Sequence, residues 1–301
     1  MKNPLVFAIV VTYNGDKWYD RCFTSLSESE IPVETIVVDN GSSSESLCYL
    51  KQRFPNIHLI ENGKNLGFAK ANNIGILKAV EKGAEYVFLL NQDAWVERST
   101  ISELIRTFIE IRETGISVPI QLNGTRSGLD EGFSQYMPNE FISDTYMQRL
   151  KDYYVVPFVN AAAWMISAEC IKRVGGFDTG LFFHYGEDVN YSQRVRFHHF
   201  DLVLNTRCSF CHDREFRQGH EKEYRERIMQ LSPFDRENRL YGDINKDYDI
   251  KSLIRKQVKF LCYAIMTFSP SKIKKHRQTI KQLKLIHQSR VANMAGGLVW
   301  L

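Results

Sequence analysis

The first 120 residues of the chain alternate short apolar runs with stretches of helical spacing, and this alternation constrains the fold more than any other feature of the sequence. Leu5 to Thr12 is an almost uninterrupted apolar run, as expected of a strand that is buried on both faces of a sheet. Strands that alternate with helices form mostly parallel sheets covered by helices. We therefore expect an α/β fold with a Rossmann-like, mostly parallel central sheet.

The same two patterns predict the remaining elements. Helices are predicted at residues 16–28, 67–82 and 187–198, and from a capping box formed by Thr100 and Glu103. Strands are predicted at residues 35–39, 57–60, 86–90, 116–122 and 155–166. Residues 123–150 have an uneven pattern with several Gly, Ser and Asp residues, and we interpret them as a mobile loop that closes over substrates.

Composition and cysteine usage indicate a globular chain in a reducing compartment. The sequence is 44% apolar and 25% charged, which is ordinary for a folded domain. Its six cysteines are scattered and form no framework of the kind that secreted proteins use. The apolar run at residues 6–11 is too short for a signal peptide, and no stretch approaches the ~18–20 apolar residues of a membrane-spanning helix. We expect a cytoplasmic protein.

The net charge of +4 conceals an uneven distribution. Residues 251–301 contain eleven Lys or Arg and no Asp or Glu, so the preceding residues carry 28 of the 39 basic side chains and all 35 acidic ones. Apolar residues recur among these lysines, as in a basic amphipathic helix. Such a helix either lies on an anionic membrane surface or packs on the domain with a solvated basic face. We disfavour nucleic acid as a partner, because no recognised binding module accompanies the charge.

The residues that follow the first two strands bear on function, because open α/β sheets bind ligands at the carboxyl ends of their strands. The first strand leads into Thr12-Tyr13-Asn14-Gly15, which is not a glycine-rich dinucleotide turn, and the chain has no Walker A sequence. A nicotinamide-dependent oxidoreductase is therefore disfavoured. Asp39 ends the second strand and begins an Asp-Asn-Gly-Ser sequence. Taken alone, this sequence is either a turn or a group that binds a base or ribose.

Five segments, in this order and spacing, resemble motifs of the family 2 glycosyltransferases: residues 10–14 (VVTYN), 37–42 (VVDNGS), 65–75 (NLGFAKANNIG), 89–93 (LLNQD) and 175–190 (GGFDTGLFFHYGEDVN). The likeness is closest to the rhamnosyltransferase-like members that build bacterial surface polysaccharides. It implies a GT-A type fold and inverting transfer of a sugar from a nucleotide to an acceptor hydroxyl. It also implies a catalytic domain at 1–222, with a nucleotide-sugar half at about 1–122 and an acceptor half at about 123–222. Residues 223–301 would form a basic helical extension.

The resemblance implies that the ends of the first two strands hold the nucleobase and ribose. The residues at these positions are Thr12, Tyr13, Asn14 and Asp39. Asp39 would accept a hydrogen bond from a pyrimidine imide N–H, which suits a dTDP- or UDP-sugar. A second stretch would run beside the donor, and its matching residues are Asn65, Gly67, Lys70 and Asn73. The helix that begins there would direct N–H groups at the phosphates, with Lys70 either adding a charge or solvated.

A divalent metal, Mg²⁺ or Mn²⁺, is implied after the fourth strand. Many members have a D-x-D motif there, whereas this chain has Asn91-Gln92-Asp93, so Asp93 is the anionic ligand and Asn91 lies beside the donor. One carboxylate, diphosphate oxygens and water suffice for such a cation. His212 falls where the family often has a histidine after the last core strand, near the metal or the diphosphate, and we assign it that role. It also ends a C-x-x-C-H sequence, but haem and structural zinc are disfavoured without an export signal or a second cysteine pair.

The catalytic base is implied by the last of the five segments. Asp188 matches the usual base, and the adjacent Glu187 is the second candidate. A sugar hydroxyl is a poor nucleophile until a carboxylate takes its proton. A Glu-Asp pair at a helix start can also serve only to favour the helix dipole.

Two alternatives remain open beside an active transferase. One is a non-catalytic member that binds a nucleotide or sugar, and the other is a different nucleotide-dependent transferase, such as a nucleotidyltransferase. The active transferase would use a dTDP- or UDP-sugar, with rhamnose the first choice. It would act on a saccharide or lipid-linked saccharide, in the cytoplasm or on the inner face of the plasma membrane.

Overall fold

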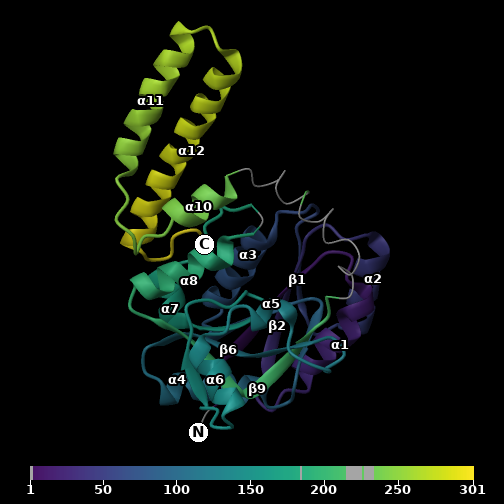
Figure 1. Ribbon diagram of the computed structural model, residues 1–301. Coiled ribbons are helices and arrows are strands. Elements are labelled where there is room, and N and C mark those ends of the chain that lie inside the picture. The colour runs from purple at the N-terminus through teal and green to yellow at the C-terminus, as the bar shows by residue number, and fades with distance from the viewer. Residues whose placement is uncertain (1–2, 184, 215–225, 227–233) are drawn as a thin grey trace.

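A mixed β-sheet runs through the body of the molecule, which the computed structural model describes at residues 3–183, 185–214, 226 and 234–301 (Figure 1). The long apolar run near the start of the sequence forms β1 (Val6–Thr12). β1 pairs in parallel with β2 (Val33–Asp39) and β4 (Tyr86–Asn91), and β2 pairs in parallel with β3 (His58–Glu61). The carboxyl ends of these strands therefore lie at one edge of the sheet.

Antiparallel pairs complete the sheet. Its other strands are β5 (Ala94–Val96), β6 (Thr114–Asn123), β7 (Tyr153–Val155), β8 (Ala163–Ser167) and β9 (Asp201–His212). Across the described residues the strand order is β3-β2-β1-β4-β8-β6-β9-β5, with β7 paired to β9. β8 runs antiparallel to both β4 and β6, whereas β6 and β9 are parallel to each other. The predicted α/β fold with a Rossmann-like central sheet is confirmed.

Helices cover both faces of the sheet and bury two apolar clusters (Figure 1). One face is covered by α1 (Asp16–Ser27), α2 (Ser44–Arg53) and α4 (Thr100–Glu110). The other is covered by α3 (Phe68–Glu81), α7 (Ala168–Val174) and α8 (Glu187–Phe197). Successive residues of β1 point to opposite faces, so that Phe7 and Ile9 join one cluster while Ala8 and Val10 join the other. β1 is apolar throughout because both of its faces are covered.

The single continuous strand predicted over residues 155–166 is wrong, because the structure has a strand at each end of this range and none in the middle. β7 ends at Val155 and β8 begins at Ala163, and the residues between them are irregular. In this interval the chain passes from the edge of β9 to the centre of the sheet between β4 and β6. Pro157 lies within the interval and has no N–H to donate to a ladder. An apolar run alone does not reveal such a crossing.

The capping box predicted at Thr100 is also wrong. α4 includes Thr100, whose hydroxyl accepts from the Glu97 N–H (3.0 Å) and donates to the Ser209 carbonyl (2.9 Å). The side chain therefore closes the preceding turn and ties it to β9, rather than capping the helix. The short strand β5, which follows Asp93 directly, was not predicted from the sequence.

The segment at residues 123–150, predicted to be a loose loop, contains two short helices. These are α5 (Glu131–Ser134) and α6 (Asn139–Tyr146). Phe133 and Phe141 are buried in the apolar cluster that α3, α7 and α8 cover. Asp130 caps α5 by accepting from the Phe133 N–H (3.0 Å). Aromatic residues thus fasten this segment to the body, although its Gly, Ser and Asp content predicts a loop.

A helical hairpin projects from the body at the C-terminal end of the chain (Figure 1). Its helices are α11 (Ile250–Met266) and α12 (Pro270–Ala295), and α10 (Asp235–Tyr241) precedes them. Leu283 and Ile286 of α12 pack with Leu181 and Phe182 of the body. The predicted domain boundary at 222 lies outside the described residues, so it stays a prediction. Within the part of the chain that the structure describes, no helix is both long enough and apolar enough to cross a membrane.

Candidate active site

Asp39 ends β2 and organises the loop that follows. Its carboxylate is buried and accepts hydrogen bonds from the Thr12 hydroxyl (3.0 Å), from the N–H groups of Gly41 and Ser42 (2.9 Å each) and from the Ser42 hydroxyl. A carboxylate offers about four acceptor positions, and these four bonds occupy them. A pyrimidine imide can reach Asp39 only by replacing one of them, and the rotatable Ser42 hydroxyl is the bond most easily exchanged. The role of Asp39 as a base acceptor stays a prediction.

The β1 loop is held by the residues that follow β2 and β4. Asn14 has a left-handed backbone (φ +46°) and accepts from the Ser43 N–H (2.8 Å). The Tyr13 N–H donates to Gln92 Oε1 (2.9 Å), and the Gln92 amide donates back to the Tyr13 carbonyl (3.3 Å). The Tyr13 ring is half exposed and free to stack on a base. Gln92, to which the sequence assigned no role, therefore fixes the loop that carries Tyr13.

The start of α3 is built by a group of asparagines. The Asn40 amide donates to the Gly67 carbonyl (3.2 Å), and Asn65 Oδ1 accepts from the Gly67 N–H (2.9 Å). Gly67 has φ +81°, and a Cβ at this position would lie 2.5 Å from the Phe183 carbonyl oxygen. The first turn of α3 therefore lies against the loop that leads to α8. Lys70 is in this turn and its side chain is exposed.

The side chain of Asn73, which was predicted to lie beside the donor, makes its hydrogen bonds inside the fold instead. Its side chain is buried and donates to the carbonyls of Phe177 (2.8 Å) and Trp300 (2.9 Å). Its Oδ1 accepts from the Phe177 N–H (2.8 Å). The whole amide is therefore used to hold the turn before α8 against the C-terminal residues. Asn73 is on the core side of α3, and this explains why it supports the site rather than lining it.

Asp93 and His212 face each other at the ends of neighbouring segments of the sheet. His212 Nε2 lies 3.2 Å from Asp93 Oδ1 and 3.4 Å from the amide nitrogen of Asn91. His212 Nδ1 lies 2.6 Å from the amide nitrogen of Gln121 at the end of β6. The imidazole is buried, whereas the Asp93 side chain is 20% exposed. Polar side chains from β4, β6 and β9 therefore converge on one point.

The Asp93–His212 pair fits a divalent cation. Gln121 Oε1 is buried without a hydrogen-bond partner among the described residues. If the Gln121 amide is rotated by 180°, its Oε1 can accept from His212 Nδ1–H. His212 Nε2 would then present a lone pair toward Asp93, as in metal sites with an oriented histidine. No cluster of three or more His, Cys, Asp or Glu side chains is arranged for a metal within the described ranges. Further ligands would be diphosphate oxygens and water.

Glu187 and Asp188 begin α8. Gly186 caps the helix with a left-handed backbone (φ +92°), and a Cβ there would lie 2.9 Å from the Phe182 ring. Glu187 is buried, and burial, together with the neighbouring Asp188 charge, raises its pKa to about 8. Asp188 is partly exposed. Desolvation raises its pKa too, but the N–H groups of Val189 and Ala161 favour its ionised form.

The start of α8 is connected to the end of β4. Ala161, whose N–H interacts with Asp188, precedes Ala162, and the Ala162 carbonyl accepts from the Asn91 N–H (2.9 Å). Asp188 thus lies along the same edge of the sheet as Asp93 and His212. Several buried polar atoms in this region have no partner among the described residues: Asn160 Oδ1, Glu187 Oε2 and both side-chain polar atoms of Asn190. Unpaired buried polar groups are uncommon, and water or substrate would satisfy them.

Two supporting residues were missed from the sequence. Asp178 is buried and accepts from the N–H groups of Gly180 (2.9 Å) and Leu181 (3.1 Å), which shapes the loop before α8. Arg194 is also buried and donates to the carbonyls of Gly176 and Val174. Asp178 could have been found as the one acid of the GGFD segment without an assigned role. Nothing in the sequence indicates that Arg194 is buried, because a basic residue on a helix is usually solvated.

The fold matches solved glycosyltransferase structures. One is GalNAc-T7 with UDP, GalNAc and Mn²⁺ (TM-score 0.58, 19% identity, covering 69% of this chain and 43% of that one). A second is S. aureus TarS 1–349 with UDP (TM-score 0.54, 14% identity, 97% and 89%). A third is the mannosyltransferase PcManGT from Pyrobaculum calidifontis with GDP-Man and Mn²⁺ (TM-score 0.52, 15% identity, 97% and 88%). At these identities the likeness shows the fold alone, and that fold is of the GT-A class.

Within this class, the chain belongs to glycosyl transferase family 2, whose family model matches residues 7–175. The chain is 31% identical over 196 residues to the dTDP-rhamnosyl transferase RfbF of Shigella flexneri, covering 61% of this chain and 60% of that protein. It is 24% identical over 212 residues to an N-acetylglucosaminyl-diphospho-decaprenol L-rhamnosyltransferase of Mycobacterium tuberculosis, covering 62% and 69%. The match to the Shigella protein thus spans less than two thirds of its length. The predicted family resemblance is confirmed.

Proposed function

We propose that this chain is an inverting glycosyltransferase that moves a sugar from a nucleoside diphosphate to an acceptor hydroxyl. The observation that carries the proposal is the position of Asp188 in a family 2 fold. This carboxylate begins α8 beside Ala161, and the adjoining Ala162 is bonded to the end of β4 near Asp93. An acceptor hydroxyl needs such a group to take its proton.

In the proposed step, the acceptor O–H gives its proton to Asp188 while the acceptor oxygen forms a bond to the anomeric carbon of the donor sugar. The bond from this carbon to the diphosphate oxygen breaks, and the nucleoside diphosphate leaves with its electron pair. Attack opposite the leaving group inverts the anomeric centre. Glu187 holds a proton near neutral pH, because its pKa is raised to about 8. Burial raises the pKa of Asp188 too, but the N–H groups of Val189 and Ala161 favour its ionised form, and we propose that Asp188 is the partner that acts as the base.

Asp93 and His212 are the residues that we propose to hold Mg²⁺ or Mn²⁺. The cation, when bound, neutralises negative charge on the leaving diphosphate. Gln121 would orient the imidazole through Nδ1. The Mn²⁺ in the GalNAc-T7 and PcManGT structures supports a divalent cation in this chain.

The proposed donor is a dTDP- or UDP-sugar, with dTDP-rhamnose the first choice. The name of the Shigella relative supports this choice. The exposed Tyr13 ring would stack on the base, with Thr12, Asn14 and Asp39 shaping the pocket around it. The N–H groups at the start of α3, after Asn65 and Gly67, would face the phosphates with Lys70 and Asn91 nearby.

The proposed acceptor is a saccharide or a lipid-linked saccharide in surface-polysaccharide synthesis. The name of the mycobacterial relative describes transfer to a diphospho-decaprenol carrier, which supports a lipid-linked acceptor here. We propose that the enzyme works in the cytoplasm at an anionic membrane surface. The basic segment 251–301 supports this location.

A thermal-shift screen against nucleotide sugars, with and without Mn²⁺ or Mg²⁺, tests the proposal first. Ligand at a hundred times its dissociation constant stabilises a protein by about 2.7 kcal/mol, which such a screen detects. We expect a metal-dependent shift with a dTDP- or UDP-sugar, followed by release of the nucleoside diphosphate when an acceptor is added. Binding without any transfer would favour the non-catalytic alternative. Pyrophosphate release from a nucleoside triphosphate would instead indicate a nucleotidyltransferase.

A further inference from the structure

The hairpin of α11 and α12 has a fixed inner end and a free outer end. Leu283 and Ile286 are buried against the body, and Ile250 joins the same cluster. Ahead of Leu283, no residue of α12 is buried, and Ala264 is the one buried residue of α11 beyond its first turn. Figure 1 shows this outer part extending away from the sheet and its helices. The outer end therefore does not contribute to the core of the body.

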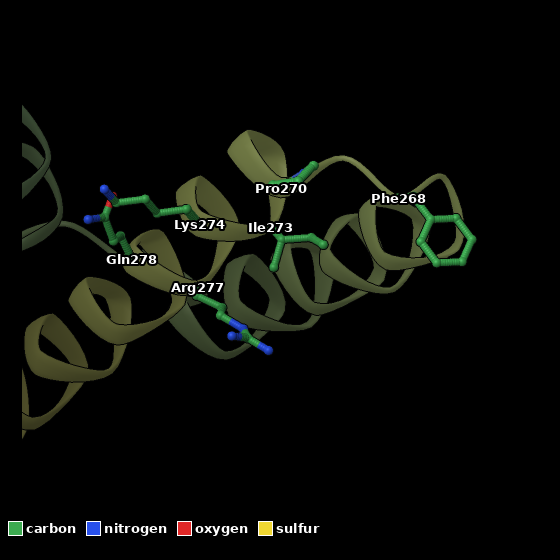
Figure 2. A pocket seen from close by; sticks show the side chains of 6 residues that line it. All are labelled: Phe268, Pro270, Ile273, Lys274, Arg277 and Gln278. Carbon is green, nitrogen blue, oxygen red and sulfur yellow. The ribbon is translucent and has the colours of Figure 1, made fainter.

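The outer end exposes large apolar side chains. Phe268 is 90% exposed, Met266 is 77% exposed and Tyr263 is 63% exposed. Val258, Cys262, Ile265 and Met266 are all exposed and follow helical spacing, so they share one side of α11. Phe268 lies in the turn with φ +46°, a backbone conformation that is unfavourable for a bulky residue. Figure 2 shows its ring at the outermost point of the hairpin. Such a concentration of exposed apolar groups marks an interaction site.

Cations are set back from this apolar end. Those nearest to the turn are Lys272, Lys274, Lys275 and Arg277, and all are exposed. Lys274, Arg277, Lys281 and Lys284 follow helical spacing and form a row along α12. None of these cations forms an ion pair with another described residue. An open pocket of about 550 Å³ lies where the apolar and basic groups meet (Figure 2). It is lined by Phe268, Pro270, Ile273, Lys274, Arg277 and Gln278.

We infer that the outer end of this hairpin inserts into the surface of an anionic phospholipid bilayer. Phe268 and Met266 enter the boundary between headgroups and acyl chains, to the ~5–10 Å depth typical of interfacial helices. Lys274 and Arg277 lie about 6–11 Å along α12 from its first residue at the helical rise, and so meet the lipid phosphates. The inference places the proposed membrane contact on this hairpin. Only the purpose of that contact rests on the proposed function.

The basic charge and the exposed apolar side chains together favour an anionic bilayer as the partner of the hairpin. Nucleic acid would match the cations but would leave Phe268 and Met266 exposed to water. A second copy of the chain would bring two rows of like charge together, which is unfavourable. An anionic bilayer matches both features, because it offers phosphates above an apolar interior.

The test measures co-sedimentation of the full chain with vesicles of phosphatidylcholine, alone or mixed with phosphatidylglycerol. We expect binding at least tenfold stronger to the mixed vesicles. The double variant Met266→Ser/Phe268→Ser should bind these about tenfold more weakly, and Lys274→Glu/Arg277→Glu at least thirtyfold more weakly. A matched control is Arg112→Glu/Lys172→Glu, which makes the same charge change at exposed positions of the body. The control should stay within twofold of wild type.

Insertion of the tip has its own readout. Phe268→Trp should show tryptophan quenching by brominated lipids beyond that of the native tryptophans. The inference is overturned if wild type does not bind mixed vesicles, if the tip variant binds like wild type, or if the control loses as much as Lys274→Glu/Arg277→Glu. It is equally overturned if the tip variant abolishes a concentration-dependent dimer that excludes vesicles, or if DNA binds more tightly than vesicles. Vesicle binding needs no donor, and the nucleotide-sugar thermal shift needs no vesicles, so the two proposals fail independently.

Discussion

Glu187 and Asp188 are neighbouring carboxylates whose surroundings differ. Glu187 is buried with Oε2 unpaired among the described residues, and burial raises its pKa to about 8. Burial raises the pKa of Asp188 as well, whereas the N–H groups of Val189 and Ala161 beside it favour the ionised form. We therefore propose that Glu187 holds the proton of the pair near neutral pH and that Asp188 is the partner that ionises. A general base must be in this form before it accepts the proton of the acceptor.

Replacing Asp188 tests its assignment as the base. Asp188→Asn keeps the shape of the side chain but cannot accept the proton, so we expect transfer to fall by 10²–10⁴-fold. Donor affinity should stay within about twofold, because the proposed nucleotide pocket lies at the ends of β1 and β2 and does not include Asp188. Nucleotide release with acceptor and donor titration by thermal shift measure the two effects. Glu187→Gln is the matched variant, and a greater loss in it would move the base to Glu187.

The raised pKa of Glu187 makes stability depend on pH. The folded state keeps this proton up to about pH 8, whereas the unfolded state releases it near 4.5. Between these values the folded state binds more protons, so the free energy of unfolding falls as pH rises through this window. Glu187→Gln should reduce that fall by on the order of a few kcal/mol. Urea unfolding at pH 5.5, 7.0 and 8.5 measures it, and equal slopes in both proteins would contradict the assignment.

Removing Asp93 tests the proposed metal site. Asp93→Ala leaves His212 without the carboxylate that it faces at 3.2 Å, and we expect the metal-dependent part of the donor thermal shift to disappear. The shift produced by the nucleotide without metal should remain. Adding a chelator to wild type should reproduce the variant. A full metal-dependent shift in Asp93→Ala would show that the cation binds elsewhere.

At the residue scale, the sequence located positions better than roles. The ends of β1, β2 and β4 came from local patterns, and their polar residues lie where those patterns predict. The four hydrogen bonds of Asp39 and the buried amide of Asn73 depend on partners from other segments. The contact of Gln121 with His212 depends on the pairing of β6 with β9, so it is seen only in the structure. A motif predicts where a residue lies in the fold, whereas the hydrogen-bond partners of its polar groups come from distant parts of the sequence.

At the element scale, α12 is fastened to the turn that precedes α8. Asp178 Oδ2 accepts from the Ser289 hydroxyl and from the Asn293 amide (3.1 Å). Asn293 Oδ1 accepts from the Trp300 indole (2.8 Å). Asp178 and Ser289 are 111 residues apart, so no periodicity predicts their contact. The sequence did predict a basic helical segment here, but not that its inner end supports the site.

Substitutions that remove these hydrogen bonds should lower the free energy of unfolding of the body. Ser289→Ala and Asn293→Ala each leave an acceptor position of a buried carboxylate unfilled, at a cost of about 1–3 kcal/mol. Asn293→Ala should cost more, because it also removes the contact to Trp300. Urea unfolding measures the losses. Gln288→Ala, at an exposed position of the same helix, is the control and should change stability by no more than ~0.5 kcal/mol. Equal stability in all three variants would mean that α12 is not a support of the site.

At the scale of the whole molecule, α12 joins the proposed membrane contact to the proposed catalytic centre. It is one helix from Pro270 to Ala295, about 39 Å long at the usual rise, with the exposed end near Phe268 and the buried end at Asp178. Because α12 is continuous and is paired with α11, the position of its outer end determines the position of its inner end. The hairpin would therefore set the height of Asp188 above the bilayer, and thereby the acceptors that it can reach.

Lengthening the hairpin tests this role. Seven residues added to each helix in its outer half preserve the packed sides and move the tip outward by about 10 Å. Vesicle binding should be unchanged, because the tip and its cations are kept. Transfer to a lipid-linked acceptor in vesicles should fall at least tenfold, since a misplacement of even 1 Å can cost a hundredfold in rate. Transfer to a short-chain acceptor in solution should stay at the wild-type rate, which controls for damage to the site. If the lengthened protein uses the lipid-linked acceptor as well as wild type does, the hairpin anchors the enzyme without setting its height.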